Sequence, residues 1–170
     1  MDKEELRSRS SLGKDFLTYV CYQSDKNAGL VKTPGSGQQF SLWVDGKIVL
    51  EDDRDPLPNM VSHSGDDFTE QDLKQAIRSG KKVREARFRI EQGASTWSFT
   101  LRAERFEVSG LKIDMPGTRD IDEKFFDRML NIEAFSSLMD GIYEYFINEV
   151  HQKTWKMKGY QEFQRWLQAK

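Results

Sequence analysis

The sequence predicts an α+β fold, in which a mainly antiparallel sheet built from two hairpins is packed by an N-terminal helix, a middle helix and C-terminal helices. Two pairs of β-rich runs flank turn residues, and amphipathic helical stripes lie before, between and after them. A length of 170 residues suits one domain, and 37% hydrophobic with 32% charged residues is typical of a globular chain.

The beginning of the chain predicts a flexible N-terminus over residues 1–11, followed by a single domain over residues 12–170. Residues 1–11 are polar and charged, a composition that favours fraying at a chain end. Ser10 or Ser11 can then cap a helix that runs to about Ser24 with its apolar residues on one side. Residues 25–38 combine glycines and a proline with polar residues, which predicts a loop.

The first hairpin is predicted at Asp45-Gly46. This pair lies between the β-rich runs 39–44 and 47–51, and Asp-Gly favours the type I′ turn of a two-residue hairpin. The resulting register places Trp43 opposite Ile48. Because apolar groups then fall on both faces, we expect this hairpin to be central in the sheet.

The second hairpin is predicted between residues 82–91 and 96–103, joined by the loop 92–95. Apolar and polar residues alternate along its second strand, which is typical of a strand with one buried face. Cross-strand partners should contact each other on each face of the sheet. The predicted register pairs Phe88 with Phe99, Ile90 with Trp97, and Glu85 with Arg102.

Shorter elements surround the two hairpins. Residues 59–64 and 105–111 are predicted as further strands. Between the hairpins, Thr69 or Asp67 can cap a middle helix that runs through Ser79.

A long apolar stripe predicts the C-terminal helices. From Asp120 or Asp122 onward, large apolar residues alternate spacings of four and three, as expected for one helix face that packs on the sheet or on a partner helix. A break near residues 134–141 is allowed, because Gly141 costs about 1 kcal/mol relative to Ala in a helix interior. A short amphipathic helix follows Gly159. The stripe consists of Phe125, Met129, Ile132, Met139, Tyr143, Phe146 and Val150.

Candidate catalytic and metal-ligating residues are few and scattered. Cys21 lies among aromatic residues of the first helix, which favours a buried structural thiol over a nucleophile. His63 and His151 are remote from each other, and no spacing suits zinc. The acidic run 51–55 lacks the spacing of a calcium loop. We therefore predict no enzyme activity, no cofactor and no metal.

The chain is expected to act in a reducing, cytoplasmic compartment. No stretch approaches the ~20 apolar residues of a membrane span, and the charged N-terminus lacks the apolar segment of a signal peptide. A single cysteine excludes an internal disulfide. No membrane partner is expected.

Charge alternates along the chain in blocks. Residues 78–105 carry eight basic and three acidic groups, and residues 151–170 carry five and one, in a chain of net charge −2. A locally positive surface can therefore contact DNA phosphates without reading bases; alternatively, these cations only solvate their surfaces. The candidate DNA-binding residues are Lys81, Lys82, Arg84, Arg87, Arg89, Arg102, Lys153, Lys156 and Lys158.

Five segments resemble, in order, the C-terminal part of recombination-associated proteins of the RdgC family, in the form found in some bacteria outside the enteric group. They are GKDFLTYVCYQS, FSLWVDGKIVLE, SGKKVREARFRI, WSFTLRAERFEVSGLK and FFDRMLNIEAFSSLMDGIYEYF. The resemblance covers residues 12–168. It implies non-sequence-specific DNA binding, restraint of recombinase-driven strand exchange and a nucleoid-associated location. The better-studied members form a dimeric ring, but their N-terminal half has no counterpart here, so a closed ring is not implied.

Two functions remain open at this point. The first is a non-enzymatic, non-sequence-specific DNA-associated protein that resembles a regulator of recombinase-mediated homologous recombination. It would bind the phosphate backbone of duplex or single-stranded DNA and have no small-molecule substrate. The alternative is a protein–protein interaction or dimerisation module, without direct DNA binding, that a mobile element can encode. Its C-terminal stripe would form a homodimer or dock on a partner.

Overall fold

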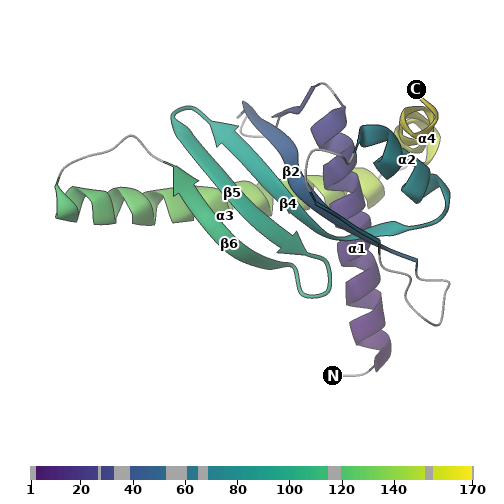
Figure 1. The fold of residues 1–170 in the computed structure, drawn as a ribbon, viewed down its shortest axis with the longest axis horizontal. Helices are drawn as coiled ribbons and strands as arrows, with labels where there is room; N and C mark the ends of the chain where they lie inside the picture. The colour runs from purple at the N-terminus through teal and green to yellow at the C-terminus, as the bar shows by residue number, and fades with distance from the viewer. Residues whose placement is uncertain are drawn as a thin grey trace.

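One antiparallel sheet forms one layer of the protein, and the helices lie on one side of it (Figure 1). The computed structural model describes residues 3–26, 28–32, 39–52, 61–64, 69–114, 120–151 and 155–169. The α+β class and the mainly antiparallel sheet predicted from the sequence are confirmed.

Six strands form the sheet in the described residues, in the order β1-β2-β4-β5-β6, with β3 also paired to β2. Every pairing is antiparallel. β4 pairs along one edge of β2, while β1 and β3 share its other edge. The strands are β1 (Leu30–Lys32), β2 (Gln39–Glu51), β3 (Val61–Ser64), β4 (Lys82–Gln92), β5 (Ser95–Arg102) and β6 (Glu107–Asp114).

The helices follow the predicted order. α1 begins at Lys3, so the segment predicted as a flexible N-terminus is helical from that residue onward. Thr69 caps α2 as predicted, and α3 continues through Gly141 without a break. The helical segments are α1 (Lys3–Asp25), α2 (Glu70–Arg78), α3 (Ile121–His151), the π-helical turn η1 (Trp155–Gly159) and α4 (Tyr160–Gln168).

The predicted first hairpin is wrong, because residues 39–51 form one strand, β2. Gly46 has a φ of +69°, which suits glycine, but the chain passes through it without reversing. The reason is the length of β4, which pairs with both halves of β2 while a register shift between Val44 and Ile48 absorbs the extra residues. Trp43 therefore lies opposite Arg89 instead of Ile48.

The second hairpin has the predicted register. Phe88 pairs with Phe99, Ile90 with Trp97, and Glu85 with Arg102. Since side chains alternate between faces along a strand, β5 buries its aromatic and aliphatic residues and turns Ser98, Thr100 and Arg102 outward. The sheet therefore has a core side and an outer side with different chemistry.

α1 crosses the inner side of the sheet and supplies much of the core. Phe16, Leu17 and Cys21 are almost completely buried. The hydroxyl of Thr18 accepts a hydrogen bond from the backbone nitrogen of Val83 at 3.1 Å. Such contacts fix the helix on the sheet, because a buried polar group needs a partner.

α3 packs on the sheet with only part of its length. The indole nitrogen of Trp97 donates to the carbonyl oxygen of Asn131 at 3.2 Å, and the buried residues of α3 all follow that point. The first half of α3 projects beyond the sheet (Figure 1). A helix of 31 residues spans about 46 Å, at about 1.5 Å per residue, whereas eight residues of β6 span only about 27 Å.

Of the predicted α3 stripe, only the second half therefore packs on the sheet, and packing of the first half on a partner helix stays a prediction. Phe125, Met129 and Ile132 are exposed, whereas Phe146 is buried as predicted. The face that α3 buries consists mainly of Phe135, Leu138, Ile142 and Phe146.

The contact between Gly13 of α1 and the backbone of Ala103, which follows β5, gives a test of this packing. A Cβ atom on Gly13 would overlap the carbonyl oxygen of Ala103, a backbone atom that cannot move alone. We expect Gly13→Ala to lower the free energy of unfolding by about 2 kcal/mol, a typical cost of overpacking, measured by chemical denaturation. A helix glycine without such a contact would instead gain about 1 kcal/mol on replacement by Ala, so a stabilised variant would contradict this packing.

Candidate nucleic-acid interface

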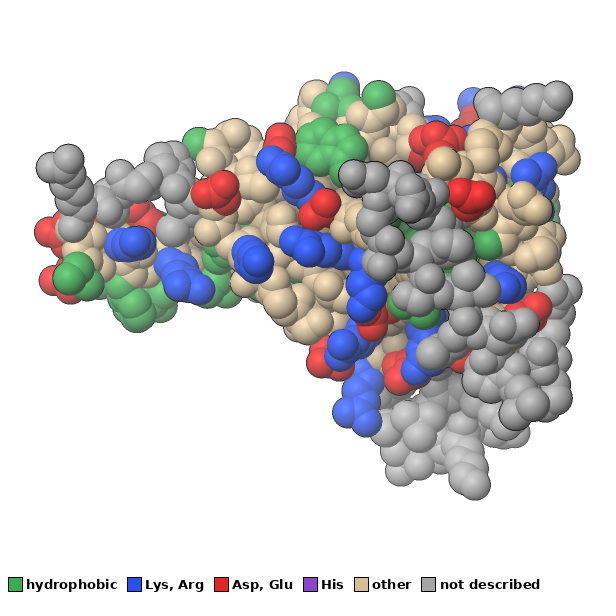
Figure 2. Space-filling model, in the orientation of Figure 1, with side chains coloured by type: hydrophobic (Ala, Val, Ile, Leu, Met, Phe, Trp, Pro, Cys, Tyr) green, Lys and Arg blue, Asp and Glu red, His purple; other side chains and the backbone are tan. Residues whose placement is uncertain are grey.

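The open face of the sheet is the outward side of β2, β4, β5 and β6, which lies toward the viewer in Figures 1 and 2. No helix of the described residues covers it. Cross-strand partners form rows across this face, and two neighbouring rows contain only cations, hydroxyls and one tryptophan. One row is Trp43, Arg89, Ser98 and Lys112, and the other is Arg87, Thr100 and Ser109.

These central rows carry the kinds of group with which proteins contact nucleic-acid backbones. Guanidinium and ammonium groups bind phosphates, and hydroxyls add hydrogen bonds to the backbone. Trp43 is 37% exposed beside Arg89, and an exposed aromatic ring gives an unpaired base a surface on which to stack.

Carboxylates border the central rows. Arg89 Nη2 lies 2.7 Å from Glu91 Oε1, and Arg87 Nε lies 3.3 Å from Asp45 Oδ2, with all four side chains about half exposed. Exposed pairs of this kind contribute about 0–1 kcal/mol, so a phosphate can compete for either guanidinium. The same carboxylates make this face less positive than its arginines alone would make it.

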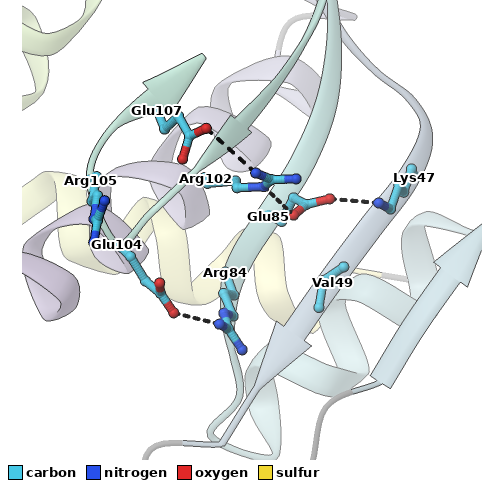
Figure 3. A pocket seen from close by; sticks show the side chains of 8 residues that line it. All are labelled: Lys47, Val49, Arg84, Glu85, Arg102, Glu104, Arg105 and Glu107. Atoms are coloured by element: carbon cyan, nitrogen blue, oxygen red, sulfur yellow. Dashed lines mark hydrogen bonds and ion pairs between the residues drawn. The ribbon is translucent and has the colours of Figure 1, made fainter. Parts of the chain in front are cut away.

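A depression of about 560 Å³ lies next to these rows, around Glu85 (Figure 3). Lys47 Nζ approaches Glu85 Oε1 at 2.6 Å from β2, and Arg102 Nε approaches Glu85 Oε2 at 2.9 Å from β5. Arg102 also lies 3.6 Å from Glu107. Cations and carboxylates thus alternate across the depression, and its charge is nearly balanced.

The residues predicted to bind DNA are divided between two sides of the protein. Arg87, Arg89 and Arg102 lie on the open face, as the register predicts. At the beginning of β4, Lys82 pairs with Asp15 of α1 at 2.7 Å, and Arg84 pairs with Glu104. Lys81 precedes that strand.

The C-terminal candidates are not next to the open face. Lys156 and Lys158 are exposed on η1. Trp155 of the same turn packs 5.9 Å from the ring of Tyr19 on α1, on the helical side of the sheet. Lys153 lies outside the described residues.

Sequence reasoning missed Trp43 and Lys112 as members of the site. The incorrect hairpin placed Trp43 opposite Ile48, and Lys112 lies one residue beyond the strand predicted over 105–111. A continuous β2 strand would have placed both in one row with Arg89.

A second unusual surface lies on α3. We call it the α3 tip patch, and it consists of large apolar side chains that are mostly solvent-exposed. Phe125, Phe126 and Leu130 are each more than 60% exposed, and Ile121 is 83% exposed. The patch is Ile121, Phe125, Phe126, Met129, Leu130 and Ile132.

Two described residues with a potentially reactive side chain, Cys21 and Tyr19, are buried in the core. Burial raises the pKa of the Cys21 thiol, so the reactive thiolate is disfavoured. Burial, and then a hydrogen bond to Glu149, raise the pKa of Tyr19 far above its usual range. Within the described ranges, no group of three or more His, Cys, Asp or Glu side chains is placed to hold a metal ion.

Comparison with known proteins adds no family assignment. No protein-family model matches the chain, and no curated protein matches it significantly. Among the helices of the described residues, none is both long and apolar enough to cross a membrane.

The contacts of Glu85 give a pH-dependent test. Partial burial alone would raise the pKa of Glu85, but hydrogen bonds from Lys47 and Arg102 outweigh it and lower the pKa. A carboxylate with a lowered pKa stabilises the fold above its unfolded pKa, and this contribution is lost as the pH falls through the folded pKa. We expect Glu85→Gln to cost about 1 kcal/mol at pH 7, and the cost to disappear in acid.

Urea denaturation of both proteins from pH 7 down to pH 3 measures this difference. Glu91→Gln is the matched control, because Glu91 pairs with Arg89 of its own strand and should contribute less. A cost for Glu85→Gln that does not change with pH would contradict an electrostatic role for Glu85.

Proposed function

We propose that this protein is a non-enzymatic, DNA-associated module that holds the phosphate backbone against its open face without reading sequence. The observation that carries the proposal is the pair of central rows, in which Arg87, Arg89 and Lys112 lie among hydroxyls and beside Trp43. The resemblance to RdgC proteins supports the same function and suggests a role as a regulator of recombinase-mediated recombination in the cytoplasm, on the nucleoid.

The composition of the open face favours a single strand over a duplex. Bases of a single strand can stack on Trp43 while their phosphates meet the flanking arginines, whereas a duplex offers its phosphates alone. Arg87 and Arg89 exchange their carboxylate partners for phosphates on binding, so the affinity of one module is expected to be modest. Phosphate contacts release counterions, and binding must therefore weaken steeply with salt.

Fluorescence titration of a labelled single strand at two salt concentrations tests this function. We expect Arg87→Ala combined with Arg89→Ala to weaken binding and to reduce the slope of log K against log salt by about two, because each arginine neutralises one phosphate. Trp43→Ala should weaken single-strand binding more than duplex binding.

Lys156→Ala combined with Lys158→Ala is the matched control, since it removes two cations from the helical side. Equal weakening of binding in both double variants would show that the open face is not the site. Binding that does not respond to salt would contradict the function.

A second candidate function is a protein-interaction module, and the α3 tip patch favours it. Monomeric proteins rarely expose contiguous apolar patches above about 300–600 Å², and large rings on a projecting helix are costly to leave in water. The patch makes no contribution to the described core, so a partner protein is the simplest explanation for its side chains.

Site-specific photo-crosslinking tests this second function in cells. We expect a photoreactive phenylalanine at Phe126 to form a covalent protein adduct, seen as a mass increase on a denaturing gel. The same group at Ser137, an exposed position outside the patch on the same helix, should form none. Absence of an adduct at Phe126, with the protein present and folded, would remove this candidate.

A further inference from the structure

We infer that the α3 tip patch binds the same patch of a second copy of this chain, with the two α3 helices side by side and parallel. This inference rests on the second candidate function, and it adds the identity of the partner and the direction of the helices.

The area of the patch fits a stable interface between two copies. Its six side chains are each more than four-tenths exposed, and because one aromatic side chain alone can bury about 150–250 Å², together they offer on the order of 700 Å². A standard interface buries about 800 Å² on each partner. A self-complementary patch gains this burial twice, once on each copy.

The spacing of the apolar residues favours a helix as the partner. Phe125, Met129, Ile132 and Met139 keep the alternating four-and-three spacing of a two-helix seam. Ser136 occupies the remaining position, and its hydroxyl donates to the carbonyl oxygen of Ile132 at 3.0 Å. The seam therefore contains no side-chain donor that requires water.

A groove continues the seam beyond the tip. It has a volume of about 560 Å³ and lies between α3 and strand β6. Val108 and Leu111 line it from the strand, and Ile132, Met139 and Tyr143 line it from the helix. Because Ile132 belongs to both surfaces, a partner helix on the patch would extend its apolar contacts into the groove.

Charge decides between parallel and antiparallel helices. By the heptad spacing, Arg128 and Glu133 flank the seam on opposite sides, and both are exposed. In a parallel pair, each Arg128 meets Glu133 of the partner subunit, five residues further along. In an antiparallel pair, residues of the same flank face each other, which brings the two arginines toward each other and likewise the two glutamates. Only the parallel pair joins opposite charges.

Cysteine cross-linking of the purified full chain tests both the partner and the direction. We expect Phe125→Cys and Ile132→Cys, made separately, each to form an intermolecular disulfide under mild oxidation. In a parallel pair, every seam residue lies next to the same residue of the partner subunit, which brings the two thiols within bonding distance. Ala134→Cys, exposed at the heptad position that points away from the seam, should not. The native Cys21 is fully buried and gives no background.

The outcomes separate the inference from the function on which it rests. A disulfide at only one of positions 125 and 132 would overturn the parallel arrangement. In an antiparallel pair, a residue lies next to its own copy only at the midpoint of the contact, so at most one of the two positions can form a disulfide. A strict monomer by sedimentation equilibrium, with no disulfide at either position, would overturn self-association. If Phe126 still cross-links to a different protein, the interaction function survives and this inference fails.

A charge exchange gives an independent readout of the same arrangement. We expect Arg128→Glu and Glu133→Arg each to raise the dimer dissociation constant about tenfold, because the dimer contains two copies of the pair. The double variant should restore wild-type dissociation. Asp127→Lys is the control, because it changes the net charge equally on the outward side of the helix. Failure of the double variant to recover would contradict the Arg128–Glu133 pairing.

Discussion

The position of α1 across the inner side of the sheet is the constraint from which the other features follow. Gly13 allows the helix backbone to reach Ala103, and Lys14 forms a buried ion pair with Glu51 at 2.6 Å. Because α1 occupies the middle of the inner side, α3 packs beside it with Phe135 and Phe146. The first half of α3 then has no sheet beneath it, and its apolar face is left uncovered.

The same constraint gives the open face its character. All helices of the described residues lie on the side of α1, so the outward residues of four strands remain in water. An antiparallel sheet with one wet face displays its polar side chains at fixed spacings, and neighbouring strands align them into rows. Functional groups on such a face are positioned by backbone register, as Arg89 beside Trp43 illustrates, and they need no loop to hold them.

Sequence patterns predicted elements well where the deciding interaction was local. Alternation along β5 was enough to pair Phe88 with Phe99 and to place Arg87, Arg89 and Arg102 on one face. The Asp45-Gly46 signal failed because β4 pairs with both halves of β2, a tertiary interaction that local turn propensity does not reveal. The α3 stripe identified an apolar face, but spacing alone does not say what covers it. Trp43 and Lys112 could not be assigned to the candidate site before the sheet order was known, because strand pairing places them in one row with Arg89.

In the proposed function, the open face and the α3 tip patch act together. Arg87 and Arg89 would have to exchange their carboxylate partners for phosphates, so we expect a single open face to hold a nucleic-acid strand only weakly. Linking two such faces makes the second contact intramolecular, and avidity can then exceed either single affinity by about 10²–10⁴ without new contacts. Linkage is reciprocal: the free energy that dimerisation contributes to the binding of one long strand equals the free energy that the bound strand contributes to dimerisation. A strand too short to reach both faces would lose this coupling while keeping its contacts with one of them.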